Sequence, residues 1–283
     1  MSSWTKKVMF VGLPRFLEQL LAACFRKEAW EVGRLRATEE ERPPADIKTY
    51  DCTLESAEAS MAFSVENLDL LIYRLESDPA AGAHRLDTVL RLAVASKVRR
   101  VFLLSSDKVF APHTEPTEKD EPLPEGEMGA LFARLEALAL AYREQGLSVS
   151  ILRLSEIYAP GQTSSDGFIG RVFGAALMGR PLPHFAEPDA VSCGFLDARD
   201  AVYAIYQAAA RDFDGSHLHI GASTGTTMGE IYAICREFFP RMDEMATPWE
   251  TEGRAILKSE IAERELGWKT EKTLEEMCRD SWR

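Results

Sequence analysis

Short runs of apolar residues alternate with segments of helical periodicity along the first half of this chain. The clearest runs, Val8–Val11 and Val101–Leu104, are apolar at every position, and a strand of that kind is buried on both of its faces. Such strands, separated by helices, build a parallel sheet that helices cover on both sides. The runs predict strands at Val8–Val11, Trp30–Leu35, Leu68–Tyr73, Val101–Leu104 and Ser148–Leu154, and the periodic segments predict helices at about Arg15–Lys27, His84–Ser96 and Ala130–Arg143.

This alternation is typical of a doubly wound α/β fold of the Rossmann type, in which ligands bind beyond the carboxyl ends of the strands. We expect residues 1–160 to form a Rossmann-like, dinucleotide-binding-type domain. After Pro160 the alternation of apolar runs and helical segments becomes less regular, which indicates a smaller carboxyl-terminal substrate-type lobe over residues 161–283. We expect parts of 195–225 to return to the Rossmann core. The connection Lys108–Glu127 holds four prolines and many acidic residues, and it is long enough to be a functional loop.

The charge balance and the cysteines restrict the function classes. The formal net charge of −12 disfavours a nucleic-acid-binding face, because such binding rests on neutralising phosphates with basic side chains. The five cysteines lie far apart and form no Cys-x-x-Cys or Cys/His cluster, so we expect neither a zinc site nor a disulfide framework. No apolar stretch approaches the length of a membrane span, and the amino-terminal run is too short for a signal peptide. The sequence therefore predicts a cytoplasmic protein that binds no metal, nucleic acid or membrane.

A degenerate catalytic motif lies near the middle of the chain. The strand predicted at Val101–Leu104 continues into two serines, and a helix begins some twenty residues later near Met128. This order resembles the extended short-chain dehydrogenase/reductases of the NAD-dependent epimerase/dehydratase family, and the resemblance covers nearly the whole chain. In that family the strand ends in Ser-Ser or Ser-Thr and the helix carries Tyr-x-x-x-Lys. The resemblance places Ser106 at the hydroxyl position, with Met128 and Phe132 at the tyrosine and lysine positions.

The usual reaction of the family needs a tyrosine as acid and base, with its pKa lowered by the neighbouring lysine. A thioether and a phenyl ring cannot exchange protons. None of the seven tyrosines is followed by a lysine four residues later, so the dyad has not moved within one helix. A substitute pair from different elements, Tyr73 or Tyr158 with Lys108, stays open.

The resemblance places the cofactor loop at Gly12–Glu18, where the family has Gly-x-x-Gly-x-x-Gly. Only Gly12 is kept. Arg15 and Glu18 occupy the other two glycine positions, and Pro14 removes an N–H that could face a phosphate. The positions assigned to cofactor binding are Gly12, Arg15, Phe16, Leu17, Arg34, Asp51 and Cys52.

At the end of the second predicted strand, Arg34 and Arg36 replace the acid that holds a ribose hydroxyl in the family. One interpretation is a pocket of Arg15, Arg34 and Arg36 for the 2′-phosphate of NADP or another anion; the other, which we favour, is a pair of solvent-exposed arginines on a loop. Asp51 matches a family residue that faces adenine. Residues 74–76, Arg-Leu-Glu, replace the small residues beside the nicotinamide. Together these departures predict impaired binding of NAD or NADP.

The substrate positions also depart from the family pattern. Glu156 replaces an asparagine that touches a sugar or nucleotide, and Cys193 replaces the arginine that holds a diphosphate. Asp200 is kept, and we expect it to tie a helix start to a loop. Arg171 and Arg180 are candidate substitutes for the lost arginine, or solvated loop residues. The histidines form no metal-ligand spacing with carboxylates.

These observations predict a family member that has lost the Tyr/Lys chemistry and acts as a ligand-binding, scaffold or regulatory homologue. The alternative is an active nucleotide-sugar epimerase, dehydratase or reductase that uses NAD(P) by a non-standard mechanism. Expected partners are a small anionic or nucleotide ligand and a protein partner. We also expect a homodimer through the helices at His84–Ser96 and Ala130–Arg143, because the apolar arc of the second helix is wide. Light scattering at micromolar concentration tests that expectation. The arc consists of Leu131, Phe132, Leu135, Leu138, Ala139 and Tyr142.

Overall fold

The computed structural model describes residues 5–36, 47–159, 168–185, 187–222, 224–239, 244–248 and 253–282. The chain forms two compact units whose segments interleave along the sequence. Unit 1 comprises residues 1–105, 126–152 and 205–218, and unit 2 comprises residues 106–125, 153–204 and 219–283. No helix of the described ranges combines the length and the apolar character that a membrane crossing requires.

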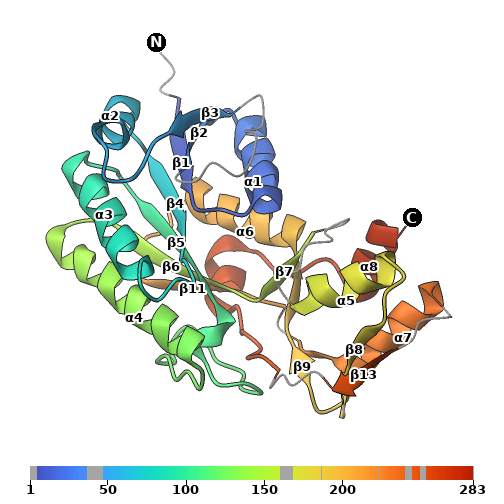
Figure 1. The fold of residues 1–283 in the computed structure, drawn as a ribbon. Coiled ribbons are helices and arrows are strands. Elements are labelled where there is room, and N and C mark those ends of the chain that lie inside the picture. The colour runs from blue at the N-terminus through green and yellow to red at the C-terminus, as the bar shows by residue number, and fades with distance from the viewer. Residues whose placement is uncertain are drawn as a thin grey trace. The chain divides into compact units, whose positions relative to one another are not determined.

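Unit 1 is built on a seven-stranded sheet with the order β11-β6-β5-β4-β1-β2-β3. The pairs β3–β2, β2–β1, β1–β4 and β4–β5 are all parallel. The predicted doubly wound α/β fold is therefore confirmed (Figure 1). The strands are β1 (Lys7–Val11), β2 (Glu31–Arg36), β3 (Lys48–Asp51), β4 (Leu70–Arg74), β5 (Val101–Ser106), β6 (Val149–Leu154) and β11 (His217–Ile220), the last three of which end in residues of unit 2.

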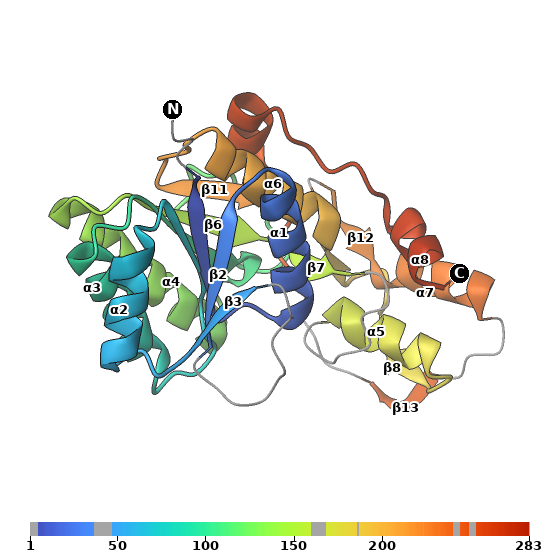
Figure 2. The same ribbon diagram turned by 90° about the horizontal axis from the view of Figure 1, so that it is seen from above.

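Helices cover both faces of this sheet, as the apolar strands require. Helices α2 (Ala57–Glu66), α3 (Gly82–Ala95) and α4 (Glu127–Ala141) lie on one face, and α1 (Arg15–Lys27) and the part of α6 (Ala198–Ala210) that belongs to unit 1, residues 205–210, lie on the other (Figure 2). Helix α1 turns its apolar stripe to the sheet, and its Phe25 ring meets Phe10 of β1 and Trp30 edge to face. Such aromatic contacts each add about 0.5–1.5 kcal/mol beyond the burial of their area.

The apolar arc of α4 is covered mainly by the chain itself. Five of its six residues are buried, and only Leu138 is half-exposed. The Tyr142 hydroxyl, just beyond α4, donates to Asp87 of α3 at 2.6 Å. The width of this arc is thus explained by packing within the chain, and the homodimer stays a prediction.

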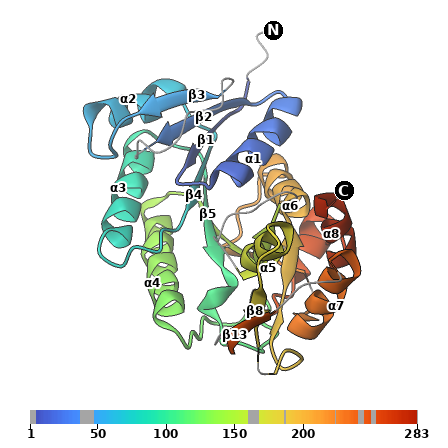
Figure 3. The same ribbon diagram turned by 45° about the vertical axis from the view of Figure 1, so that its right-hand side comes forward.

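Unit 2 has its own hydrophobic core. Helices α5 (Phe168–Leu177), α7 (Met228–Phe238) and α8 (Leu274–Trp282) contribute to it, with Phe173 against Tyr158 and Tyr232 against Phe185. Figure 3 brings these helices forward, with α7 and α8 side by side. The short strands of the unit are β7 (Glu156–Tyr158), β8 (Leu182–His184), β9 (Ser192–Cys193), β10 (Phe195–Asp197), β12 (Thr226–Thr227) and β13 (Glu244–Pro248).

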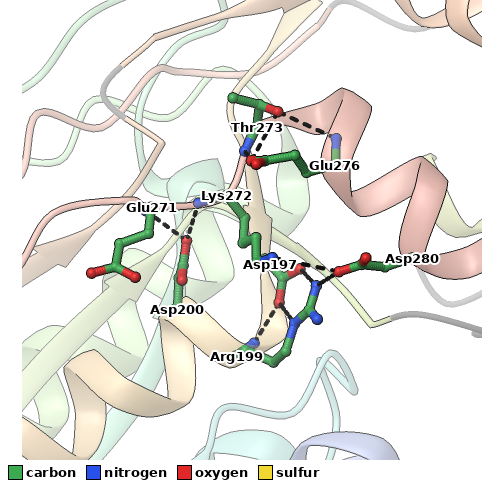
Figure 4. Close-up of polar contacts among 8 residues, drawn as sticks. All are labelled: Asp197, Arg199, Asp200, Glu271, Lys272, Thr273, Glu276 and Asp280. Carbon is green, nitrogen blue, oxygen red and sulfur yellow. Dashed lines mark hydrogen bonds and ion pairs between the residues drawn. The ribbon is translucent and has the colours of Figure 1, made fainter.

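Arg199 and Asp200, at the start of α6, contact the carboxyl-terminal segment (Figure 4). Arg199 forms a bidentate pair with the buried Asp197 and also reaches Asp280 of α8 at 2.7 Å. The Asp200 carboxylate accepts hydrogen bonds from the backbone N–H groups of Glu271 and Lys272 at 2.9 and 3.0 Å. The structural role predicted for Asp200 is therefore confirmed.

Replacing Asp200 with alanine is expected to lower the free energy of unfolding by about 1–3 kcal/mol, because two backbone donors lose their acceptor. Urea unfolding followed by circular dichroism measures the change. Asp200→Asn, which keeps one carbonyl oxygen, is the matched control and should lose less. Equal stability of Asp200→Ala and the unchanged chain would contradict the assigned role.

Candidate functional site

The carboxyl edge of the sheet in unit 1 begins at Gly12, directly after β1. Gly12 has φ +72°, a left-handed conformation that glycine adopts without strain. Pro14 follows as the N-cap of α1 and supplies neither a side-chain cap nor an N–H. Of the next three residues, Arg15 is exposed, Phe16 is half-buried and Leu17 is buried. Pro14 therefore removes one of the backbone donors that this turn could offer to a phosphate.

The side chain of Arg74 closes over this turn. Arg74 ends β4, and its Nε donates to the Gly12 carbonyl oxygen at 3.0 Å. A long cation thus lies against the one glycine that the loop retains. The next residue, Leu75, is buried, and its N–H donates to the Leu104 carbonyl at 3.0 Å.

Glu18 and Arg34 form a buried ion pair beneath the same edge. Arg34 Nη1 lies 2.7 Å from Glu18 Oε1, and both residues are more than nine-tenths buried. Arg34 Nε also donates to Thr49 Oγ1 at 3.2 Å, whereas Nη2 has no hydrogen-bond partner within the described ranges. The expectation of a solvent-exposed arginine on a loop was wrong at Arg34, which lies within β2 and points to the side of the sheet that α1 covers.

The remaining cofactor positions lie on β3 and in the segment that follows it. Asp51 ends β3 and is exposed, and Cys52 is half-buried. Asp51 lies opposite Arg36 in the register of β3 and β2. These positions stay predictions as nucleotide contacts.

The surroundings of the Tyr73 hydroxyl differ from those of a catalytic acid–base tyrosine. Tyr73 is fully buried in β4, and its hydroxyl donates to Glu76 at 3.4 Å. Burial first, and then the negative charge of Glu76, raise the pKa of Tyr73 above its ordinary value. Arg85 pairs with the same carboxylate. A tyrosine in this setting holds its proton, which argues against Tyr73 as a substitute for the family tyrosine.

Helix α4 carries Met128 and Phe132 one turn apart. Met128 is half-exposed and Phe132 is buried. One further turn along lies Glu136, which is fully buried and accepts a hydrogen bond from Ser105 Oγ at 2.5 Å. Glu136 was not identified from the sequence. The sequence feature that could have indicated Glu136 is its position as a single acid on the apolar side of the helix.

Ser106 is the first residue of unit 2. Its hydroxyl donates to Asp107 Oδ1 at 2.8 Å and accepts from the Lys108 N–H at 3.3 Å, as the N-cap of a short 3₁₀ helix at Asp107–Val109. Its oxygen is thus engaged by its own neighbours. The role of Ser106 toward a substrate stays a prediction.

A buried network of charges follows Ser106 in unit 2. Arg254 lies between two carboxylates, with Nη1 2.6 Å from Asp107 Oδ1 and Nη2 2.9 Å from Glu156 Oε2. The other Glu156 oxygen accepts from the Ile169 N–H at 2.6 Å, at the start of α5. Asp107 is fully buried, and its Oδ2 has no hydrogen-bond partner in the described part of the chain. The guanidinium is therefore neutralised by residues of its own unit.

The network includes Glu156 and acts electrostatically on Cys193, the two substrate positions at which the sequence departs from the family pattern. Burial, followed by the charge of Glu156, raises the pKa of the Cys193 thiol, so the sulfur stays protonated. Desolvation and then repulsion from Arg254 lower the pKa of Lys108, although part of its side chain is exposed. No group of three or more potential metal ligands occurs among the described residues.

The residues at this edge depart from the pattern by which the family holds a dinucleotide. The family pattern calls for a glycine-lined turn with backbone donors and for an acid at the end of the second strand. Here the turn is covered by Arg74, Pro14 lacks an N–H, and Arg34 is committed to Glu18. Each of these features places a side chain of this chain where the pattern requires open backbone or a free carboxylate.

Comparisons with known proteins identify the relatives of this chain. A model described as "NAD dependent epimerase/dehydratase family" matches residues 80–221, which are 142 of the 283 residues. The UDP-N-acetyl-α-D-glucosaminuronate decarboxylase of Bacillus cytotoxicus is 29% identical over 152 residues, which cover 50% of this chain and 47% of that protein. The match thus spans about half the length of this curated relative.

Solved structures of low sequence identity share the fold across almost the entire chain. UDP-glucose 4-epimerase of Thermotoga maritima, with UDP-glucose, has a TM-score of 0.83 at 18% identity and covers 97% of both chains. UDP-glucuronic acid 4-epimerase of Bacillus cereus, with UDP-glucuronic acid and NAD, has a TM-score of 0.84 at 14% identity and covers 98% of both chains. The dTDP-glucose 4,6-dehydratase of Bacillus anthracis, in complex with NAD, has a TM-score of 0.84 at 16% identity and covers 98% of this chain and 95% of its own.

Proposed function

Because this chain belongs to the NAD-dependent epimerase/dehydratase family, we propose that it is a homologue that has lost the Tyr/Lys chemistry and serves as a ligand-binding or scaffold protein. The observation that carries this proposal is the face of α4, which presents a thioether at Met128 and a phenyl ring at Phe132. Neither group donates or accepts a proton in the pH range of proteins. General acid–base catalysis contributes about 10²–10⁴-fold where it operates, and these two side chains cannot supply it.

The contacts of the nucleotide edge support the same proposal. Within unit 1, the Gly12 carbonyl oxygen accepts a hydrogen bond from Arg74, Arg34 is paired with Glu18, and Pro14 supplies no N–H at the helix start. We infer that NAD binds weakly or not at all. A small anion is the ligand class that this edge favours, since the exposed Arg74 and Arg15 both lie at the turn.

Incubation of the purified chain with NAD⁺ and UDP-glucose or UDP-glucuronic acid is expected to give no epimer, no decarboxylated sugar and no reduced cofactor above the uncatalysed background. Nuclear magnetic resonance of the sugar products and absorbance of NADH measure these outcomes. A family enzyme with an intact Tyr/Lys pair is the positive control. Turnover by this chain that disappears in Ser106→Ala would contradict the proposal.

An active enzyme with a non-standard mechanism is the second candidate, and one observation favours it. The Asp107, Glu156 and Arg254 network lies beside Lys108, whose pKa is lowered, so ionisable groups are available in unit 2. This candidate predicts turnover that falls in Lys108→Met while the fold is kept. The non-catalytic proposal predicts no activity for either protein.

A further inference from the structure

The side-chain amine of Lys108, in unit 2, differs from other lysines of the chain in its partners. Lys48 pairs with Glu66, and this contact raises the pKa of its ammonium group. Lys258 pairs with Glu115 at 3.0 Å. The Lys108 amine, by contrast, donates no hydrogen bond and forms no ion pair within the described ranges. No carboxylate of the described part of the chain therefore holds it in its protonated form by direct contact.

The backbone that carries Lys108 is held in place by its neighbours. Its N–H donates to Ser106 Oγ at 3.3 Å, and the Phe110 N–H closes the 3₁₀ turn on the Asp107 carbonyl oxygen at 3.0 Å. Asp107 and Val109 are completely buried, whereas Lys108 between them is exposed. The base of the Lys108 side chain is therefore fixed, while a small molecule can reach the side chain itself.

Four charged groups of unit 2 act on the Lys108 amine. Partial burial of the side chain has the largest effect and lowers its pKa, and repulsion from Arg254 lowers it further. The opposing effects of Asp107 and Glu156 are smaller, and Arg254 engages both of these carboxylates. Arg171, which is exposed on α5, adds a second repulsive charge. At neutral pH such a lysine holds more of the unprotonated, nucleophilic amine than a solvated lysine does.

We propose that Lys108 binds a small 2-oxo acid covalently, as an imine, with the carboxylate of the ligand toward Arg171. Lysines that are desolvated or lie near another cation form such Schiff bases with carbonyl compounds. The amine lone pair adds to the keto carbon, the two amine protons leave with the carbonyl oxygen as water, and C=N replaces C=O without oxidation or reduction. An acid is favoured because Lys108 and Arg171 are both exposed cations, whereas Arg254 is neutralised by its two carboxylates.

The test incubates the full chain with pyruvate and cyanoborohydride at neutral pH, which reduces the imine to a stable secondary amine, and locates the modified lysines by peptide mass spectrometry. We expect Lys108 to react about tenfold or more faster than Lys119, because a larger free-amine fraction and a held carboxylate both favour it. Lys119 is an exposed lysine of the same unit. Lys108→Arg should abolish the fast reaction, and Lys119→Arg, the matched control, should keep it. Equal rates at Lys108 and Lys119 would overturn the proposal.

Arg171→Gln tests the place of the carboxylate. It should slow the reaction of Lys108 with pyruvate and leave its reaction with propanal, which has no carboxylate, unchanged. Circular dichroism checks that the variant keeps its fold. An unchanged rate with pyruvate in Arg171→Gln would overturn the assignment of a 2-oxo acid. Neither NAD⁺ nor a nucleotide sugar is present, so failure of this experiment is distinguishable from failure of the proposed function.

Discussion

Replacing Arg254 with methionine is expected to lower the free energy of unfolding by about 3–5 kcal/mol, the cost of leaving a buried charge without its partner. Arg254 neutralises Asp107 and Glu156 at once, and both carboxylates are almost completely buried. Among the described residues, the side-chain donors to the Asp107 carboxylate are the Ser106 hydroxyl and Arg254, and both reach Oδ1. Its Oδ2 has no hydrogen-bond partner there. Denaturant unfolding at neutral pH measures the loss.

The triple variant Asp107→Asn, Glu156→Gln, Arg254→Met is the matched control. It removes all three charges while keeping their approximate volumes, and it should recover most of the stability lost in Arg254→Met. Stability of Arg254→Met within about 1 kcal/mol of the unchanged chain would show that solvent, and not the guanidinium, compensates the two carboxylates.

Replacing Glu18 with leucine should destabilise the chain by about 3 kcal/mol or more, because it leaves the Arg34 guanidinium buried with a single side-chain hydrogen bond, to Thr49. Nη1 loses its carboxylate and Nη2 already has no partner within the described ranges. The first turn of α1 would also lose an acid that stabilises its positive end, worth about 0.3–1 kcal/mol. Thermal and urea unfolding report the change.

The double variant Glu18→Leu, Arg34→Met tests whether this loss comes from the orphaned charge. An apolar pair of similar volume in place of a buried ion pair is often neutral or stabilising. We therefore expect the double variant to be more stable than Glu18→Leu alone. If Glu18→Leu and the double variant lose the same stability, then the packing of Glu18 and not its charge matters.

The fold could be predicted from the sequence because its strongest signals are local. Val8–Val11 and Val101–Leu104 are apolar at every position, and this pattern directly reflects burial on both faces of the sheet. The edge strand β3 has no such run, because its residues Lys48–Asp51 are half-buried or exposed. The sequence therefore predicted no bounds for a strand there.

The site could be predicted only where its residues are neighbours in the sequence. Gly12 and Ser106 could be placed because each lies at the end of a strand predicted from an apolar run. Arg254 meets Asp107 across 147 residues, and nothing in the local pattern around Arg254 indicates that contact. Arg34 was expected to be exposed because arginine is rarely buried, and that rule fails where a carboxylate such as Glu18 lies on the covering helix.

Thermal unfolding of the unchanged chain in a titration with NAD⁺ tests the central claim most directly, because the claim is that side chains of unit 1 occupy the dinucleotide edge. We predict no change in melting temperature at millimolar NAD⁺. A ligand at one hundred times its dissociation constant adds about 2.7 kcal/mol to stability, which corresponds to about 5–10 °C for a chain of this size. A saturable increase of that magnitude would contradict the account and would mean that the turn at Gly12 holds the cofactor despite Arg74 and the Glu18–Arg34 pair.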